Sequence, residues 1–403
     1  MKFSKLFTLL IILIAIIDCQ SHNNKKSQKT IIKQPTNANL IIDFDVNDIP
    51  SGINIEYSRK NLLFIGPLFS EGNLSPFFLR FDLNKKSADL LGNPGQDETS
   101  TQFYESLGII DNEDYLFVAQ KGWVKFFDLD GRFLYSIYSP YIQNGDAFFL
   151  QDKLVSFPSW LNPSNNYLLT YVSMQNTKKG GKRIKLKKFV TMCFEKPEKQ
   201  IKHNTTFEKN NNITHSKHII YPVIAKKINE DSCAILLVKN DVENLIYYHF
   251  SENKLIKINI KKYLIPFTKE KFIKRFALIN SLDTFKGDVF VGINLLLRSC
   301  FFGNNSPFCY IFLRFNSKGE ITGIYSHPVK LYPEKENAIL LDFEVCKLKE
   351  KEAYFLVNEW VSPITKKGNT IKIKKEKKQR IIMFKGIFFK NIEQLEKERS
   401  FHI

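Results

Sequence analysis

The chain has 403 residues, of which 43% are hydrophobic and 25% are charged, and its formal net charge is +18. This composition excludes a disordered or collagen-like chain and suffices for a large hydrophobic core. Lys far outnumbers Arg, whereas specific nucleic-acid sites commonly use the bidentate guanidinium of Arg. The net charge therefore indicates solubility and non-specific attraction, and no specific nucleic-acid partner is predicted.

The N-terminus carries the features of an export signal. Two lysines precede the uncharged segment 6–17 (LFTLLIILIAII), which is too short to span a bilayer of ~20 residues and has the form of a signal-peptide core. The sequence IIDC (16–19) follows and resembles a bacterial lipobox, in which Cys19 would become lipidated and N-terminal. Asp18 stands where such motifs usually have Gly, Ala or Ser. An ordinary signal peptide and an uncleaved anchor are the alternatives.

These features divide the chain into three parts. Residues 1–18 are predicted to be a lipoprotein-type signal peptide, and the mostly polar residues 19–39 a flexible tether. Residues 40–403 are predicted to form a single folded domain. The arrangement indicates an exported body that its lipid holds at a membrane, with the periplasmic or surface face of a bacterial outer membrane as the expected place.

The folded part repeats one hairpin pattern along its length. In the stretch 124–138 (VKFFDLDGRFLYSIY), an apolar run ends at Asp128, a polar turn follows, and a second apolar run begins at Phe133. Asp, Asn, Ser and Gly adopt or supply the backbone angles that such turns need. The pattern recurs at 77–91, 167–190, 245–260, 309–325 and 380–392, the last turning at Lys385-Gly386.

A second pair of strand-like runs precedes several of these hairpins, for example at 106–122 and 272–293. Each unit therefore has about four strands. Six such units predict an all-β fold, a six-bladed β-propeller of four-stranded antiparallel blades, because radial repetition leaves few exposed sheet edges. The early strand 40–46 (LIIDFDV) is expected to complete the last blade and close the ring.

The spacing of the hairpins exceeds the ~40–50 residues of a four-stranded blade. Two segments, 196–217 and 361–379, are therefore read as long loops that account for the excess. A helical period occurs only near 391–400, a short polar end. A large β-sandwich and two small β-domains are the alternatives to the ring.

One region also carries a family resemblance. A strand ending in Phe81-Asp82 precedes the segment GNPGQ (92–96), and a second strand ends in Phe127-Asp128, shortly before Gly131. The stretch 80–137 thereby resembles the six-bladed β-propeller lipoproteins of bacterial envelopes, which are relatives of NHL-repeat and TolB-like propellers. The family often continues after the first motif with Gly-Pro and a Glu, where this chain has two acidic residues. Because these motifs form turns, the resemblance implies a fold and no particular reaction.

The six cysteines include no CxxC motif, so zinc ribbons and thioredoxin-type chemistry lack support. If Cys19 carries lipid, at least one of the other five is unpaired. Cys300 and Cys309 flank FFGNNSPF, and a hairpin turning at 303–306 would place them opposite each other near disulfide distance. Export permits this possible disulfide, and two buried thiols in unrelated register are the alternative.

The sequence contains no recognisable catalytic or metal-binding constellation. It lacks GxSxG, P-loop, dinucleotide-fingerprint and HExxH motifs. His203, His215 and His218 lie in or beside a polar insertion without ligand spacing, so a solvated loop is favoured there, and neither a metal nor a cofactor is predicted. Asp82 and Asp128 are interpreted as turn-stabilising rather than catalytic.

Two similar basic segments are the clearest candidate for a binding surface. The segments 178–188 (KKGGKRIKLKK) and 366–375 (KKGNTIKIKK) each place a Gly-containing turn before a strand in which apolar residues alternate with Lys. Such a surface would bind anionic lipid, a polysaccharide or an acidic envelope protein; alternatively, the lysines protect exposed strands against edge-to-edge association. The residues concerned are Lys178, Lys179, Lys182, Arg183, Lys185, Lys187, Lys366, Lys367, Lys372 and Lys374.

Together these features predict a non-catalytic envelope lipoprotein whose propeller is a rigid binding or scaffolding platform, with loops on one face contacting a partner. The alternative is an enzyme, a hydrolase or lyase that acts on a sugar or lactone at the central channel. Three or more inward-facing carboxylates or histidines at one channel mouth would favour the enzyme.

Overall fold

The computed structural model describes much of the chain from residue 31 onward. The described residues are 31–33, 40–45, 51–58, 60–70, 73–95, 100–101, 104, 106–110, 115–120, 122–138, 145–150, 153–157, 160–161, 167–176, 184–193, 200–203, 221–237, 244–252, 254–260, 263, 277–295, 308–328, 336–367, 370–373 and 378–400. The predicted signal peptide and Cys19 lie outside these ranges. Within them, no helix combines the length and the apolar character needed to cross a membrane.

The strands form six antiparallel sheets, which are numbered here in chain order of their first main strand. Sheet 1 contains β3 (Ser51–Ser58), β4 (Leu62–Ser70), β6 (Phe78–Asp82) and β7 (Ser87–Leu91), with β5 (Asn73–Leu74) beside β4. Sheet 2 contains β8 (Ser106–Ile110), β9 (Tyr115–Gln120), β10 (Trp123–Asp128) and β11 (Phe133–Tyr138). Sheet 3 contains β12 (Ala147–Leu150), β13 (Lys153–Ser156), β15 (Tyr167–Asn176) and β16 (Ile184–Cys193), followed by β17 (Gln200–His203).

The second half of the chain forms the other three sheets. Sheet 4 contains β18 (Tyr221–Asn229), β19 (Ser232–Leu237), β20 (Asn244–His249) and β21 (Lys254–Asn259), with β14 (Trp160–Leu161) beside β18. Sheet 5 contains β22 (Ala277–Phe285), β23 (Asp288–Leu295), β24 (Phe308–Phe315) and β25 (Ile321–Pro328), followed by β30 (Ile387–Phe389). Sheet 6 contains β26 (Glu336–Lys349), β27 (Glu352–Lys367), β29 (Lys378–Lys385) and β2 (Leu40–Asp45), with β1 (Ile31–Lys33) and β28 (Thr370–Ile373) at its margins.

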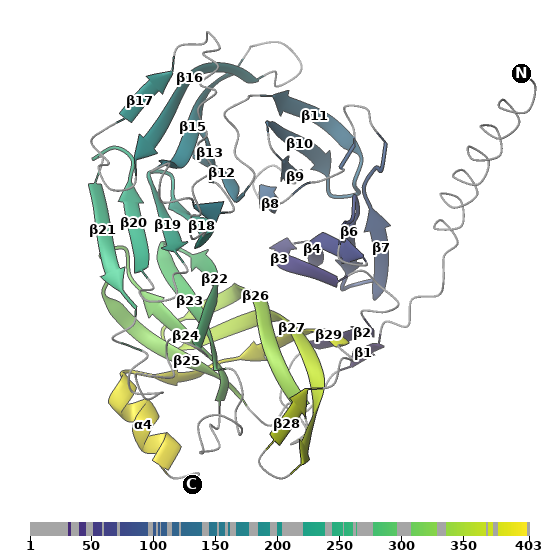
Figure 1. Cartoon of the computed structure of the whole chain (residues 1–403), viewed down its shortest axis with the longest axis vertical. Helices are drawn as coiled ribbons and strands as arrows, with labels where there is room; N and C mark the ends of the chain where they lie inside the picture. Colours follow the sequence, from purple (N-terminus) through teal and green to yellow (C-terminus); the bar gives the residue numbers. More distant parts are fainter. Residues whose placement is uncertain are drawn as a thin grey trace, which may run out of the picture.

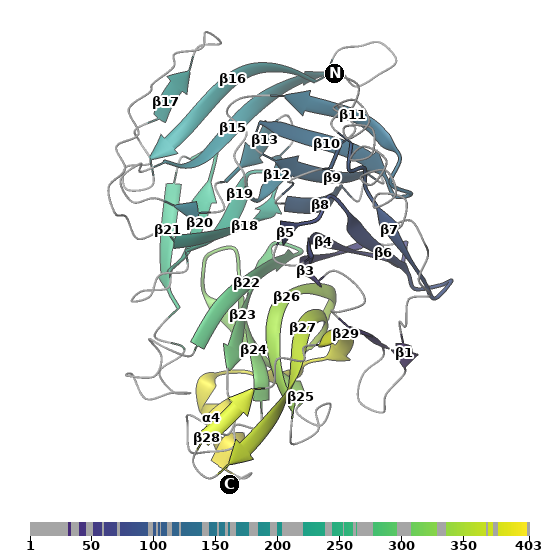
Figure 2. The same ribbon diagram turned by 45° about the vertical axis from the view of Figure 1, so that its right-hand side comes forward.

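The sheets stand radially around a common axis (Figures 1 and 2). The inner strands of sheets 1 to 6 are β3, β8, β12, β18, β22 and β26, in that order. Each of them contacts the next, and β26 contacts β3 again. Each sheet has four main antiparallel strands. The prediction of an all-β ring of four-stranded sheets is thereby confirmed.

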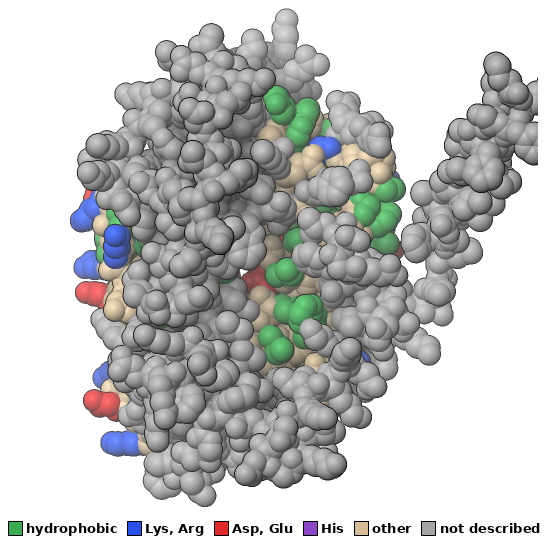
Figure 3. Space-filling model, viewed as in Figure 1, with side chains coloured by type: hydrophobic (Ala, Val, Ile, Leu, Met, Phe, Trp, Pro, Cys, Tyr) green, Lys and Arg blue, Asp and Glu red, His purple; other side chains and the backbone are tan. Residues whose placement is uncertain are grey.

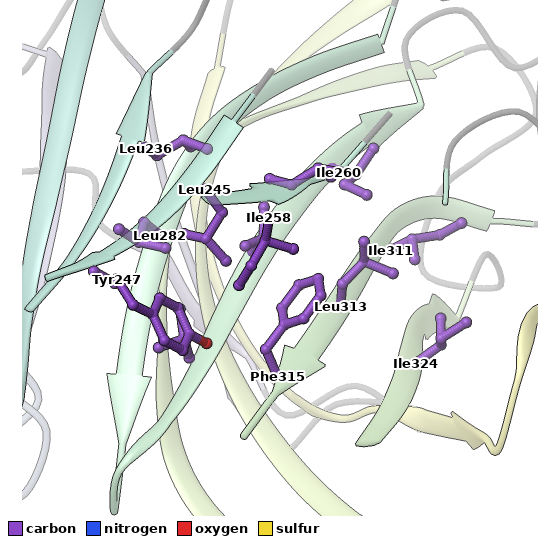
Figure 4. Packing of buried hydrophobic residues seen from close by; sticks show 14 of the residues in the cluster. Leu236, Leu245, Tyr247, Ile258, Ile260, Leu282, Ile311, Leu313, Phe315 and Ile324 are labelled. Atoms are coloured by element: carbon purple, nitrogen blue, oxygen red, sulfur yellow. The ribbon is translucent and has the colours of Figure 1, made fainter. Parts of the chain in front are cut away.

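Apolar residues fill the spaces between neighbouring sheets. Figure 4 shows the cluster between sheets 4 and 5, where Leu236 and Tyr247 lie beside Leu282, Leu313 and their neighbours. Similar clusters join sheets 1 and 2, sheets 3 and 4, sheets 5 and 6, and sheets 6 and 1. Because such burial contributes roughly 25 cal/mol per Å² of apolar surface, each sheet depends on its neighbours for most of its stability.

The ring is closed by the N-terminal strand, as predicted. β2 pairs with β29 along its whole length, from Leu40 opposite Met383 to Asp45 opposite Lys378. A buried polar network reinforces the joint, since the Gln379 amide both accepts the N–H of Gly52 and donates to its carbonyl. The Asn358 amide nitrogen donates to the same carbonyl at 3.2 Å. These bonds join sheet 6 to the first strand of sheet 1.

The predicted hairpin turns are held by their acidic or amide residue. Oδ1 of Asp128 accepts the N–H groups of Asp130 and Arg132, and Oδ1 of Asp82 accepts the N–H groups of Asn84 and Lys85. Oδ1 of Asn316 does the same in sheet 5. The interpretation of Asp82 and Asp128 as turn-stabilising residues is confirmed.

Three expectations about the ends of the chain need correction or addition. The hairpin predicted at Lys385-Gly386 is wrong: β29 pairs with β2 and β27, whereas β30 pairs with β25 of sheet 5. The outer position beside β29 is already occupied by β2, so the chain passes to the neighbouring sheet. The segment 361–379, read as a loop, instead extends β27 and forms β28. The predicted tether contains β1, which pairs with β2, and the C-terminal helical period corresponds to α4 (Ile392–Ser400).

Candidate functional site

Charged side chains from several inner strands meet at the centre of the ring. They are contributed by β3, β18, β22, β26 and the residue that precedes β12, and an acidic surface appears in the central recess of the face in Figure 3. The central cluster, as it is called below, consists of Glu56, Asp146, Lys226, Asp283, Asp342 and Glu344.

Lys226 spans the ring. Its Nζ lies 3.0 Å from Oε1 of Glu56, and the two side chains are 23% and 16% exposed. Their strands, β18 and β3, lie opposite each other, because two inner strands separate them in either direction around the ring. The ion pair therefore connects two sheets that do not pack against each other.

Three aspartates connect neighbouring inner strands through the backbone. Oδ2 of Asp342 on β26 accepts the N–H of Ile55 on β3 at 3.0 Å. Oδ2 of Asp283 on β22 accepts the N–H of Val345 on β26 at 2.6 Å. Asp146 accepts the N–H of a β18 residue, Ala225, at 2.7 Å. Each carboxylate thus links two adjacent sheets, and it provides an acceptor for an inner-strand N–H that has no other partner on the channel side.

Burial shifts the titration of these carboxyl groups toward neutral pH. It raises the pKa of Asp342 to about 7 and that of Asp283 to about 6, although Lys226 and the backbone N–H groups oppose the rise. Burial, together with the charges of Glu56 and Asp283, raises the pKa of Glu344 well above its ordinary value. Burial alone would lower the pKa of Lys226, but Glu56 and the other carboxylates raise it well above its ordinary value.

The cluster can therefore hold protons near neutral pH while keeping one ammonium charged. A carboxyl group that is protonated near pH 7 has the property required of a general acid. Among the described residues, no group of three or more His, Cys, Asp or Glu side chains is arranged to hold a metal ion. The arrangement thus supports proton exchange or strand tethering.

The basic segments predicted from the sequence lie on different sheets. Lys185 and Lys187 are on β16 of sheet 3, whereas Lys366 and Lys367 are on β27 and Lys372 on β28 of sheet 6. β16 and β28 lie at opposite ends of the molecule (Figures 1 and 2). The remaining predicted members, Lys178, Lys179, Lys182, Arg183 and Lys374, lie outside the described residues.

The predicted cysteine pair is only partly within the described chain. Cys309 is on β24, which pairs with β23 up to Tyr310 opposite Asn294, and Cys300 lies outside the described residues. The disulfide therefore stays a prediction. Cys233 and Cys346 are free thiols, and burial raises the pKa of Cys346 well above its ordinary value. His203 is on β17, which pairs with β16 inside the segment 196–217, so the prediction of a loop is wrong for these residues; His215 and His218 are not described.

Sequence reasoning missed the central cluster because its members are dispersed. One signal was present: β22 and β26 are largely apolar, yet the segments NSLDTF (280–285) and LLDFEV (340–345) each contain acidic residues. An acidic residue inside the first strand of a repeated unit indicates a side chain that faces the axis of the ring.

A ring of radially packed, four-stranded antiparallel sheets defines a β-propeller. No protein-family model and no curated protein matches the sequence. The solved structures that resemble the chain include the Dos1 propeller (12% identity, TM-score 0.36, covering 79% of this chain and 70% of that one). They also include the WD40 domain of Neurospora crassa Pan2 (8%, 0.35, 83% and 89%) and the β-propeller domain of the Trilobed protease from Pyrococcus furiosus (9%, 0.35, 85% and 92%). Since these scores are low, the assignment to the class rests on the chain's own sheets.

Proposed function

We propose that the six sheets are the blades of one closed propeller and that the chain is an exported lipoprotein whose propeller is a non-catalytic binding or scaffolding platform. The supporting observation is how the central carboxylates are used. Asp146, Asp283 and Asp342 hold backbone N–H groups of neighbouring strands, and Glu56 is paired with Lys226. Because these side chains join the sheets, we assign them a structural role. A partner would then bind to the loops and outer strands.

The anchoring part of the proposal is tested with a Cys19→Ala variant expressed in a bacterial host. The wild-type protein is expected in the membrane fraction with the gel mobility of a lipidated, processed chain. The variant is expected to lose both properties. An unchanged membrane fraction and mobility would reject lipidation at Cys19.

The binding part is tested with anionic vesicles at low ionic strength, where exposed charges are least screened. Wild-type protein is expected to bind and to be released by salt, whereas replacement of Lys185, Lys187, Lys372 and Lys374 by Gln abolishes binding. A matched control replaces four exposed lysines elsewhere, and it should retain most of the binding. Those lysines are Lys254, Lys257, Lys347 and Lys349. If the wild type does not bind at low ionic strength, anionic lipid is not the partner of the basic strands.

A second candidate function is a hydrolase or lyase acting at the channel on a sugar or lactone. The observation that favours it is the convergence of five carboxyl groups and Lys226, with Asp342 able to carry a proton near neutral pH. Screening glycosides and lactones with the wild type and with Glu344→Gln separates the candidates. Turnover that the variant loses while it remains folded would make the channel catalytic.

A further inference from the structure

The central cluster contains five carboxyl groups and one ammonium group, so full ionisation would leave four negative charges in excess. Uncompensated charge at a desolvated site is costly, and burial accordingly raises the pKa of Asp146, Asp283, Asp342 and Glu344. We propose that this cluster makes the closure of the ring depend on pH: bound protons hold the inner strands together under mildly acidic conditions, and their loss toward neutral and alkaline pH loosens the ring.

The inner strands differ in the charged groups that they bring to the channel. β3 contributes Glu56, β22 contributes Asp283, and β26 contributes Asp342 and Glu344. Asp146 faces the cluster from the start of β12, and Lys226 on β18 supplies the ammonium. β8 (SLGII) and β14 (WL) carry no ionisable side chain. The Cys346 thiol and the Tyr57 hydroxyl also act on Glu344, and burial raises the pKa of each, so both stay neutral in this range. Lys226 is the cation that opposes the buried carboxyls.

The direction of the pH effect follows from the carboxyl groups. The pKa of Asp342 rises from its ordinary 3.8 to about 7, and that of Asp283 from 3.8 to about 6. Between about pH 4 and pH 7 these two carboxyls thus bind more protons in the folded chain than in the unfolded chain, and their contribution to stability falls as the pH rises through this window. Lys226, whose pKa is raised, stays charged throughout the window.

The same carboxyls hold the sheets together, which links titration to geometry. Asp342 accepts the N–H of Ile55, and Asp283 accepts the N–H of Val345. Ionisation strengthens each of these bonds individually, but it also brings several like charges into one channel. The resulting repulsion acts on β3, β22 and β26 together, and these strands form two of the joints of the ring.

The test is hydrogen exchange of the full-length protein between pH 5 and pH 8, resolved at the amides of Ile55 and Val345 and corrected for intrinsic rates. Each unit by which a carboxyl pKa is raised corresponds to about a tenfold change in the opening equilibrium. We expect protection at both amides to fall by at least about tenfold across the range. In Asp283→Asn/Asp342→Asn, which keeps the acceptor oxygens and removes two ionisations, this fall should become at least about threefold smaller, and the remainder is due to Glu344.

Asp82→Asn is the matched control, because the Asp82 carboxyl holds a hairpin turn outside the cluster and its pKa is lowered, chiefly by the Lys85 N–H. It should leave the pH dependence at Ile55 and Val345 unchanged. An equally steep fall in the double variant, or equal protection of the wild type at pH 5 and pH 8, would overturn the proposal. If the double variant does not fold, carboxyl NMR titration of the wild type decides: Asp342 and Asp283 must titrate above pH 5.

Discussion

The ammonium of Lys226 lies 3.0 Å from the Glu56 carboxylate, although the two residues are 170 positions apart in the sequence and belong to opposite sides of the ring. This contact requires a ring whose centre is narrow enough for side chains from opposite strands to meet. It gives the molecule a brace across its axis, in addition to the packing between adjacent sheets.

Replacing Lys226 by Met should destabilise the fold strongly and in a pH-dependent way. The change leaves the cluster without its ammonium, and leaving the Glu56 carboxylate of this partly buried pair uncompensated costs about 1–3 kcal/mol. The free energy of unfolding from urea denaturation should fall by this amount at pH 7 and by less at pH 5, where the carboxyls take up protons. Lys254→Met, at an exposed position on β21, should have little effect at either pH. Equal losses for the two variants would contradict the brace.

Gln379→Leu should weaken the joint between sheets 6 and 1. The Gln379 side chain is fully buried and bonds the N–H and carbonyl of Gly52 and the Asn358 side chain. Leucine leaves these groups without that partner, which costs about 1–3 kcal/mol. Chemical denaturation measures the loss, and the control is Gln394→Leu, which removes only one exposed hydrogen bond, from the Lys390 N–H at the start of α4. A loss no larger than that of the control would show that the network is dispensable.

Shortening one buried side chain of the closing strand β2 should lower the stability of the whole ring. Ile42 on β2 is fully buried between sheets 6 and 1, so Ile42→Ala should cost about 2–5 kcal/mol. Ile53→Ala, at a position that is 38% exposed on β3, makes the same chemical change and should cost much less. Thermal melts of both variants provide the comparison. Similar melting temperatures for the two would mean that β2 is not needed for closure.

Removing the Asp128 side chain should destabilise its hairpin turn, and a replacement that keeps an acceptor oxygen should restore most of the stability. Asp128→Ala removes an acceptor for two backbone N–H groups and should cost about 1–2 kcal/mol. Asp128→Asn keeps an acceptor oxygen and should recover most of the stability, since Asn316 fills the corresponding place in sheet 5. Denaturant midpoints of the three proteins are sufficient. If Asn is no better than Ala, the turn needs the charge rather than the acceptor.

Local signals were enough to predict the repeated hairpins. The Asp128 and Asn316 turns are encoded within a few residues, and Gly131 and Gly319 take the positive φ angles that follow them. The closing role of residues 40–46 was also predictable, because an unpaired strand before the first unit fits a ring with one missing outer strand. Here the sequence pattern and the topology agree.

The remaining features depend on contacts that no local pattern contains. Lys385-Gly386 resembles a tight turn, yet the position beside β29 belongs to β2, and this competition is decided by residues at the other end of the chain. The central cluster is similar, since Glu56 and Glu344 meet only after every sheet is in place. A single sequence shows that these residues are charged, but not that they face one another.

The pairing of β2 with β29 also constrains how the protein is made. Asp43 and Arg380, which form an ion pair in this joint, are separated by 337 positions. A chain synthesised from its N-terminus presents β2 long before β29 exists, and an apolar strand without a partner readily pairs with other chains. Until β29 has been synthesised, the nascent polypeptide therefore carries a closing strand without its partner, and a chain that stops before Lys378 would never cover it.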